Sequence, residues 1–188
     1  MLRWLEVLKL CHVQDICSKI ERAVVGESVH KLDDTINNIQ GAMVEPIAVG
    51  VSAVTQAQVK PNDKVVVLGA GMIGNACLQA AKAVGASEVI VVEVSDTRLR
   101  LAKDCGADDV FDARTGDALR WVMDKFGEAP YHFQIGGNAD VVLEAAGHPT
   151  TIKQAFEMVR PGGTICFVGL PEGEVPLDTT KIVHKMPH

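Results

Sequence analysis

Three glycines lie close together between two apolar stretches of the sequence. The segment GAGMIG occupies residues 69–74 and directly follows the apolar run at residues 64–68. Gly69 suits a tight strand-to-helix turn, Gly71 leaves space for a pyrophosphate beside the backbone, and Gly74 allows close helix packing. Met72 and Ile73 would lie in the first helical turn, whose free N–H groups attract phosphate oxygens. The spacing predicts a phosphate-binding turn.

An acidic residue completes this pattern. Glu93 ends the next apolar run, about 20 residues after the glycines, where a carboxylate accepts both ribose hydroxyls of an adenosine. A 2′-phosphate at the same place would meet a like charge, so Glu93 favours NAD over NADP. Arg98 follows closely, and its flat guanidinium is suited to stacking on adenine, although an arginine here could also receive a phosphate.

Other interpretations of these residues stay open. The glycines could form a merely structural turn, and Glu93 could be a solvated acid at a strand end. A methyltransferase that binds S-adenosylmethionine also uses a glycine-rich first turn and an acid after the second strand. Such enzymes usually have an acidic residue near the first strand, where this chain has only Val65–Leu68.

The elements that must position these residues alternate along the chain. Apolar, β-rich runs predict strands at residues 64–68, 88–92, 109–111, 140–143 and 164–168. Helical patterns lie between them at residues 72–84, 97–104, 116–126 and 150–159. This alternation predicts an α/β fold, a Rossmann-type doubly wound parallel sheet in the order 3-2-1-4-5-6, with a short N-terminal helical appendage.

The chain divides into three predicted parts. Residues 1–44 form an N-terminal appendage and connector, with an imperfect amphipathic helix at 1–29 and a polar stretch at 30–40. Residues 45–180 form the NAD-binding domain, in which Pro161–Gly163 predict a turn before the last strand. Residues 181–188 form a C-terminal tail.

Composition narrows the class of protein. The 188 residues are 47% hydrophobic and carry a formal net charge of −6, which argues against nucleic-acid or anionic-membrane partners. The five cysteines form no C-x-x-C pair and suit reduced thiols in a cytoplasmic protein. The N-terminus mixes acids with bases, unlike a targeting leader, and no apolar run is long enough to span a membrane.

Five motifs in order carry a resemblance to a known family. They are HKLDDTINNIQGAMVEPIAVGVSAV, VVVLGAGMIGNACLQAAKAVGA, TRLRLAKDCGAD, ADVVLEAAGHP and RPGGTICFVGLP. Together they resemble the zinc-dependent medium-chain dehydrogenase/reductase family, in particular its sorbitol and xylitol (polyol) dehydrogenase branch, over residues 28 to 180. The resemblance implies NAD-linked oxidation of a secondary alcohol, with zinc as Lewis acid on the alkoxide in the complete enzyme.

The resemblance also assigns residues to the site. Gly69, Gly71, Ile73 and Gly74 match the pyrophosphate turn, and Arg98 matches a basic residue beside the adenosine. Glu93 stands where this branch usually has Asp. The remaining matches are Ala146 and Gly147 in the turn after the fourth strand, and Val168, Gly169 and Leu170 along the nicotinamide.

Zinc is harder to place. Glu45 matches a position that faces the catalytic zinc, where a carboxylate can ligate the metal or hold its water. It also reads as an acid in the first turn of a helix, followed by Pro46. The family's Gly-His-Glu motif and its four-cysteine zinc loop are missing. Cys11, His12 and Cys17 would not converge on one helix.

We therefore expect the nucleotide-binding half of an NAD-dependent alcohol or polyol dehydrogenase, inactive by itself. The alternative is a catalytically silent NAD-binding module or truncated product, and a zinc-free quinone or enoyl reductase is a third reading that Glu93 opposes. The segment KIVHKMPH ends before a sixth strand. The edge strand at residues 164–168 would then present unpaired backbone groups, which predicts self-association.

Overall fold

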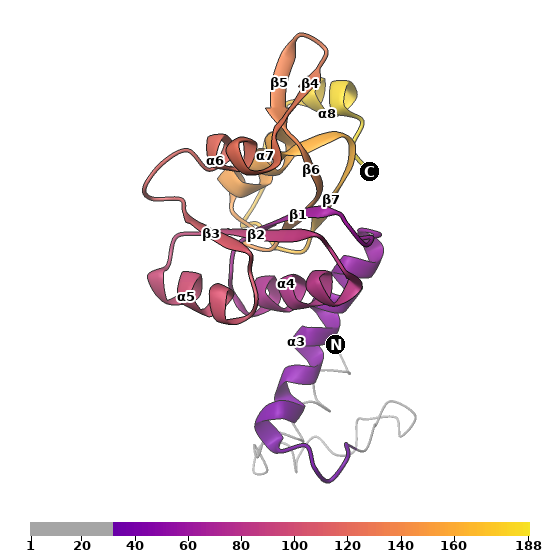
Figure 1. Cartoon of the computed structure of the whole chain (residues 1–188), viewed down its shortest axis with the longest axis vertical. Coiled ribbons are helices and arrows are strands. Elements are labelled where there is room, and N and C mark those ends of the chain that lie inside the picture. The colour runs from indigo at the N-terminus through magenta and orange to yellow at the C-terminus, as the bar shows by residue number, and fades with distance from the viewer. Residues whose placement is uncertain (1–31) are drawn as a thin grey trace. The chain divides into compact units, whose positions relative to one another are not determined.

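The computed structural model describes residues 32–188 (Figure 1). The helix predicted at residues 1–29 and the Cys11–His12–Cys17 cluster lie outside the described residues. The chain divides into two compact units, Met1–Ala48 and Val49–His188. The glycine turn and every strand within residues 32–188 belong to the second unit.

A parallel sheet is the centre of the second unit. Its strands are β1 (Lys64–Leu68), β2 (Glu88–Glu93), β3 (Asp109–Asp112), β6 (Ala139–Glu144) and β7 (Val159–Phe167). Their order in the sheet is β3-β2-β1-β6-β7, and every neighbouring pair is parallel. The predicted fold class and the order of the first five strands of the doubly wound sheet are confirmed.

Helices cover both faces of this sheet. They are α4 (Met72–Val84), α5 (Asp96–Asp104), α6 (Ala118–Phe126) and α7 (Pro149–Met158). In Figure 1, α4 and α5 lie on one face, and α6 and α7 lie on the other. The chain crosses to the second face between β3 and β6, so the strand order reverses beside β1, which is where doubly wound folds bind ligands.

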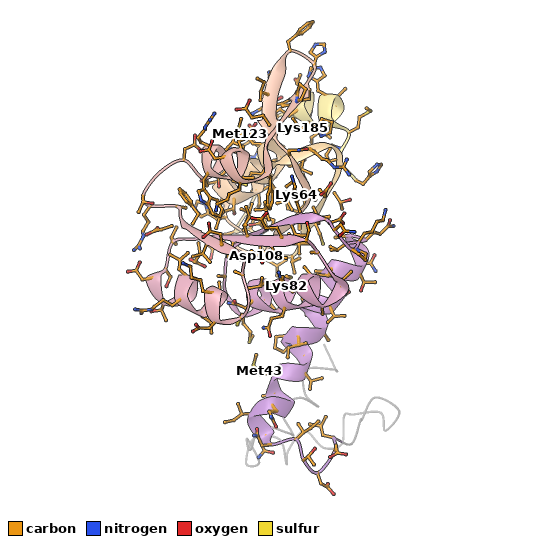
Figure 2. All side chains as sticks on the ribbon, in the orientation of Figure 1. Met43, Lys64, Lys82, Asp108, Met123 and Lys185 are labelled. Carbon is orange, nitrogen blue, oxygen red and sulfur yellow. The ribbon has the colours of Figure 1, made fainter. Side chains whose placement is uncertain are left out.

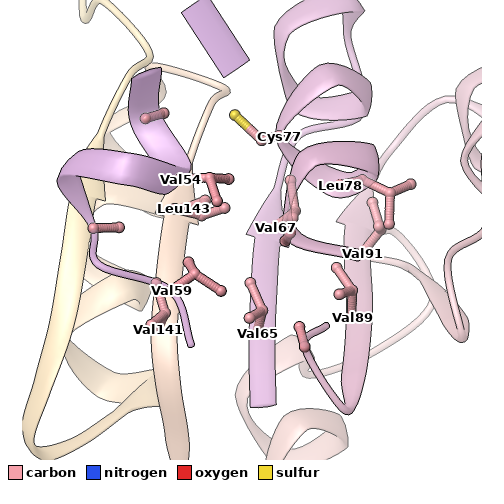
Figure 3. Packing of buried hydrophobic residues seen from close by; sticks show 14 of the residues in the cluster. Val54, Val59, Val65, Val67, Cys77, Leu78, Val89, Val91, Val141 and Leu143 are labelled. Atoms are coloured by element: carbon pink, nitrogen blue, oxygen red, sulfur yellow. The ribbon is translucent and has the colours of Figure 1, made fainter. Parts of the chain in front are cut away.

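Alternating strand residues build two separate cores, as expected for a sheet buried on both sides. Val65 and Val67 face α4 with Leu78, whereas Val66 and Leu68 belong to the core on the α6 and α7 side. Figure 3 shows the first of these cores, in which Cys77 also packs. Burial raises the pKa of the Cys77 thiol to about 11, so this thiol is uncharged at neutral pH.

Helix α3 (Asn38–Gln56) starts earlier than the sequence pattern indicated. The Gln40 N–H donates to the Asn37 side chain at 2.9 Å, and the Asn37 N–H donates to the Gln40 side chain at 3.0 Å. This reciprocal pair is a capping box, which starts the helix inside the predicted connector. The interpretation of Glu45 as a first-turn acid is therefore wrong, and Pro46 lies inside the helix.

Sequence reasoning missed a hairpin before β6 and an irregularity within β7. Strands β4 (Glu128–Tyr131) and β5 (Gln134–Gly137) form an antiparallel hairpin before β6. The predicted turn at residues 161–163 is instead an irregularity within β7. There, Ala139 pairs with Val159 and Val141 with Thr164, so the longer stretch of β7 bulges between them.

The C-terminal residues contact the edge of the sheet. Helix α8 (Thr179–Lys185) is followed by His188, which donates its N–H to the Gly163 carbonyl at 2.8 Å. The His188 carbonyl accepts from the Ile165 N–H at 2.9 Å, which is the pattern of a parallel pairing beside Thr164. The prediction of an unpaired edge is wrong at these groups. No helix in residues 32–188 is long and apolar enough to cross a membrane.

Candidate dinucleotide-binding site

The glycine turn joins β1 to α4 with the geometry that its sequence predicts. Gly69 adopts φ +92°, a left-handed conformation that favours glycine. A Cβ atom added to Gly74 would lie 1.9 Å from the Gly69 carbonyl oxygen, so α4 packs against the turn at a distance only glycine allows. The first and third glycines therefore shape the turn itself.

Gly71 behaves differently from the other two glycines. It precedes the first residue of α4, has extended backbone angles, and no side chain caps the helix at this position. A Cβ atom added to Gly71 would meet no protein atom within 4 Å. The open space lies where the free N–H groups of a helix begin, which is a suitable place for an anionic group.

Glu93 is buried beside this turn, with only 6% of its surface exposed. Its Oε2 accepts the Ala70 N–H at 2.8 Å, and its Oε1 accepts the N–H groups of Val94 and Ser95 at 2.7 and 3.0 Å. These hydrogen bonds to an ionised acceptor offset the cost of burying the carboxylate. The last residue of β2 thus holds the first turn of the site in place.

Arg98 lies in the first turn of α5, beside Glu93. Its guanidinium is 3.8 Å from Glu93 Oε2, and 57% of its side chain is exposed. Because the guanidinium is exposed to solvent and lies no closer than 3.8 Å to the Glu93 carboxylate, it is free to turn toward a ligand. The structure brings the two predicted adenosine-side residues together.

Sequence reasoning missed Asn75, which follows the third glycine. Its amide donates to the carbonyls of Ala70 and Gly71 at 2.7 and 3.1 Å, so the side chain braces the turn from inside α4. Its Oδ1 is buried without a hydrogen-bond partner. No spacing rule indicates this role, because it depends on the particular way the turn folds over the helix.

The turns after β6 and β7 complete the same edge of the sheet. A Cβ atom added to Gly69 would lie 2.9 Å from the Ala146 side chain, which places the turns after β1 and β6 side by side. A Cβ atom added to Gly169 would lie 2.1 Å from the Gly147 nitrogen. Four strand ends therefore meet around one area, and the predicted residues of these turns lie there together.

Side chains along this edge differ in their exposure. Met72 is 55% exposed and Leu170 is 91% exposed, although both side chains are apolar. Exposed apolar groups in these turns suit a flat, partly apolar ligand. The arrangement fits a dinucleotide, with polar contacts at the turn and apolar contacts beside it.

Zinc does not fit the described residues in the same way. Within residues 32–188, no group of three or more His, Cys, Asp and Glu side chains is arranged to hold a metal ion. A catalytic zinc needs about three protein ligands. Glu45 lies in the other compact unit, and its role as a zinc ligand remains a prediction.

Comparisons with known proteins identify the family. The profile of the zinc-binding dehydrogenases matches residues 72–188, which is more than half of the chain. The chain belongs to the zinc-binding dehydrogenase family. An uncharacterised zinc-type alcohol dehydrogenase-like protein of Escherichia coli, YdjJ, is 39% identical over 81% of this chain and 42% of its own length.

Two further proteins are similar to the chain. Sorbitol dehydrogenase of Arabidopsis thaliana is 36% identical over 78% of this chain and 40% of its own length. A putative zinc-binding dehydrogenase from Sinorhizobium meliloti, solved with NADP bound, superposes with a TM-score of 0.72. It is 32% identical over 84% of this chain and 45% of its own. The resemblance to the polyol branch is confirmed, and the chain spans about two fifths of these curated relatives.

Proposed function

We propose that residues 49–188 bind NAD(H) for hydride transfer between a nicotinamide and a secondary alcohol or polyol. The observation that carries this proposal is the open backbone at Gly71 beside the buried carboxylate of Glu93. The pyrophosphate would lie at the start of α4, and the adenosine ribose would lie over the end of β2. When bound, the nicotinamide supplies the hydride chemistry.

The contacts of Glu93 refine how it would hold the ribose. A carboxylate oxygen accepts about two hydrogen bonds. Oε1 already accepts two N–H groups, whereas Oε2 accepts one, from Ala70. We therefore expect Glu93 to accept one ribose hydroxyl through Oε2 rather than both.

The same residues favour NADH over NADPH. A 2′-phosphate would approach the charge of Glu93, which is held in place by backbone groups and cannot easily withdraw. The competing outcome is that Arg98 turns to pair with the phosphate, since a related protein was solved with NADP. Affinity for the two cofactors decides between these outcomes.

Calorimetric titration of the unmutated chain with NADH and NADPH tests the proposal. We expect Glu93→Ala to weaken NADH binding about 10- to 100-fold, because it removes a charge-assisted hydrogen bond and a brace of the turn. Glu88→Ala is the matched control, since Glu88 begins the same strand at its opposite end. Equal affinity of the unmutated chain for both cofactors would contradict the preference.

Turnover is the second test. We expect the 188-residue chain to bind NADH but not to oxidise sorbitol, xylitol or simple secondary alcohols, because residues 32–188 hold no group of three metal ligands. NADH absorbance with and without added zinc measures this. Zinc-dependent NADH production would contradict the expectation, whereas binding without turnover would agree with it, both for the nucleotide-binding half of a dehydrogenase and for a silent dinucleotide-binding module. A cytoplasmic location also remains a proposal, which cell fractionation would test.

A further inference from the structure

Glu144 is a buried carboxylate that the glycine motif does not involve. It is the last residue of β6, and none of its surface is exposed. Removing a carboxylate from water is unfavourable unless hydrogen-bond donors surround it. The donors around Glu144 therefore indicate what this residue stabilises.

The side chain collects donors from two neighbouring segments. Its Oε1 accepts the N–H groups of Ala146 and Gly147 at 3.1 and 2.9 Å and the Thr151 hydroxyl at 2.7 Å. The Gly147 N–H also lies 3.2 Å from Oε2. The carboxylate thus fixes the turn after β6 to the first turn of α7.

The backbone of the same residue holds a third segment. The Glu144 carbonyl accepts the N–H groups of Val168 and Gly169 at 2.8 and 2.9 Å, just beyond the end of β7. A Cβ atom added to Gly169 would lie 2.8 Å from Oε2, so the segment passes directly over the carboxylate. One residue therefore sets the positions of both turns on the β6 and β7 side of the site.

Geometry indicates which half of a dinucleotide would meet these turns. If the pyrophosphate lies at Gly71 and the adenosine ribose at Glu93, the adenosine half occupies the β2 side of β1. The other half must then cross the point where the strand order reverses and lie over the ends of β6 and β7. Glu93 and Asn75 brace the first side, and Glu144 braces the second.

We propose that Glu144 is a positioning residue for the nicotinamide half of the cofactor. This inference rests on the proposed function, because it assumes that a dinucleotide binds across β1. Its carboxylate holds the Ala146–Gly147 turn, against which the Val168–Gly169 segment passes, in the arrangement that the ring meets. Loss of Glu144 then affects the nicotinamide half and leaves the adenosine half bound.

Two ligands separate this role from a general structural one. NADH carries both halves, whereas ADP-ribose lacks the nicotinamide base. In calorimetry on the full chain, we expect Glu144→Ala to weaken NADH about tenfold or more and ADP-ribose by less than about twofold. NADH fluorescence in the bound state should also shift back toward that of free NADH, because the ring is no longer held.

Conservative variants keep the test decisive if Glu144→Ala does not fold. Glu144→Gln retains one oxygen for the three donors at Oε1, so NADH binding should recover to within about threefold of the unmutated chain. Thr151→Val removes one donor and should weaken NADH selectively. Glu128→Gln is the matched control, because Glu128 lies in the hairpin in an exposed ion pair.

The outcomes distinguish this inference from the proposed function. If the unmutated chain binds neither ligand, the proposed function fails. If the unmutated chain binds both, equal losses for NADH and ADP-ribose in the folded Glu144 and Thr151 variants would overturn the positioning role. Unchanged NADH affinity in Glu144→Ala would overturn it as well.

Discussion

Two glycines of one motif have opposite relations to the protein around them. Gly71 faces open space, whereas a Cβ atom on Gly74 would collide with the Gly69 carbonyl oxygen at 1.9 Å. Gly71 therefore leaves room for a ligand, whereas Gly74 allows the close packing of α4 against the turn. Substitution at the two positions should separate binding from stability.

We predict that Gly71→Val abolishes measurable NADH binding and changes the free energy of unfolding by less than about 1 kcal/mol. The valine Cβ would enter the space proposed for the pyrophosphate, where it meets no protein atom within 4 Å. Calorimetry and urea unfolding measure the two effects. A folded Gly71→Val variant that binds NADH normally would show that the turn is purely structural.

We predict that Gly74→Ala lowers the stability of the fold. The added methyl group forces α4 away from the turn, which should destabilise the fold by about 1–3 kcal/mol. Urea unfolding with fluorescence detection measures the change. Stability equal to that of the unmutated chain would contradict the close packing between α4 and the turn.

At the scale of elements, Lys185 anchors α8 to the end of α7. Its Nζ donates to the carbonyls of Glu157 and Val159 at 2.7 and 2.8 Å and lies 4.4 Å from the centre of the Tyr131 ring. Lys185 is the last residue of α8, and Figure 2 labels its side chain. Burial lowers the pKa of Lys185 from 10.5 to about 8.

This pKa predicts how stability depends on pH. Between about pH 8 and 10.5 the unfolded chain binds more protons at Lys185 than the folded chain, so stability rises with pH in this window. Below pH 8 the full penalty of burying the charge remains. Urea unfolding of the unmutated chain and of Lys185→Met at pH 7.5, 9 and 10.5 measures the difference, which should grow in favour of the unmutated chain. A difference independent of pH would contradict the prediction.

The regular elements were predictable because each has its own pattern of apolar residues within a short stretch of sequence. Residues 64–68 and 72–84 match β1 and α4 at both ends, since buried strands and amphipathic helices are local patterns. The start of α3 was missed, although Asn37 and Gln40 have capping-box spacing. The hairpin could not be predicted from the sequence, because Pro130 interrupts its strand pattern and His132 adopts φ +51° at its tip.

The site was predictable only in part, for a related reason. The glycines and Glu93 follow a spacing rule, and the structure brings them together. The bracing contacts of Asn75 and Glu144 depend on backbone groups in folded turns, which no single-residue pattern indicates. Nor does the sequence show that Glu93 has already used most of its hydrogen-bonding capacity.

For the whole molecule, self-association remains a prediction. The exposed surface that favours it is on the hairpin and α8 rather than at the β7 edge. His188 pairs with part of the β7 edge, whereas the hairpin and α8 expose apolar side chains. The exposed fractions are 92% for Phe133, 58% for Ile135 and 68% for Val183. Exposed apolar groups gathered on neighbouring elements favour association.

Light scattering over a range of protein concentrations tests this prediction. We expect an average mass above that of the 20.1 kDa monomer, and a lower mass for the double variant Phe133→Ser, Ile135→Thr. Leu101→Ser is the control, because this half-exposed apolar side chain lies on α5 and not on the hairpin. A monomeric unmutated chain would contradict the prediction, and an unchanged mass in the double variant would exclude the hairpin as its cause.

The strand order has a consequence for how the chain folds. Strands β1, β2 and β3 are consecutive in sequence and adjacent in the sheet, whereas Val65 on β1 must also pair with Val141 on β6. Closing that longer loop is entropically slower, so the β1–β3 half should form before β6 and β7 dock. We therefore expect the area around the glycine turn, between the β1–β3 half and β6, to be completed only when β6 and β7 dock. In stopped-flow refolding with NADH present, the change in NADH fluorescence that accompanies binding should lag behind the return of helical circular dichroism.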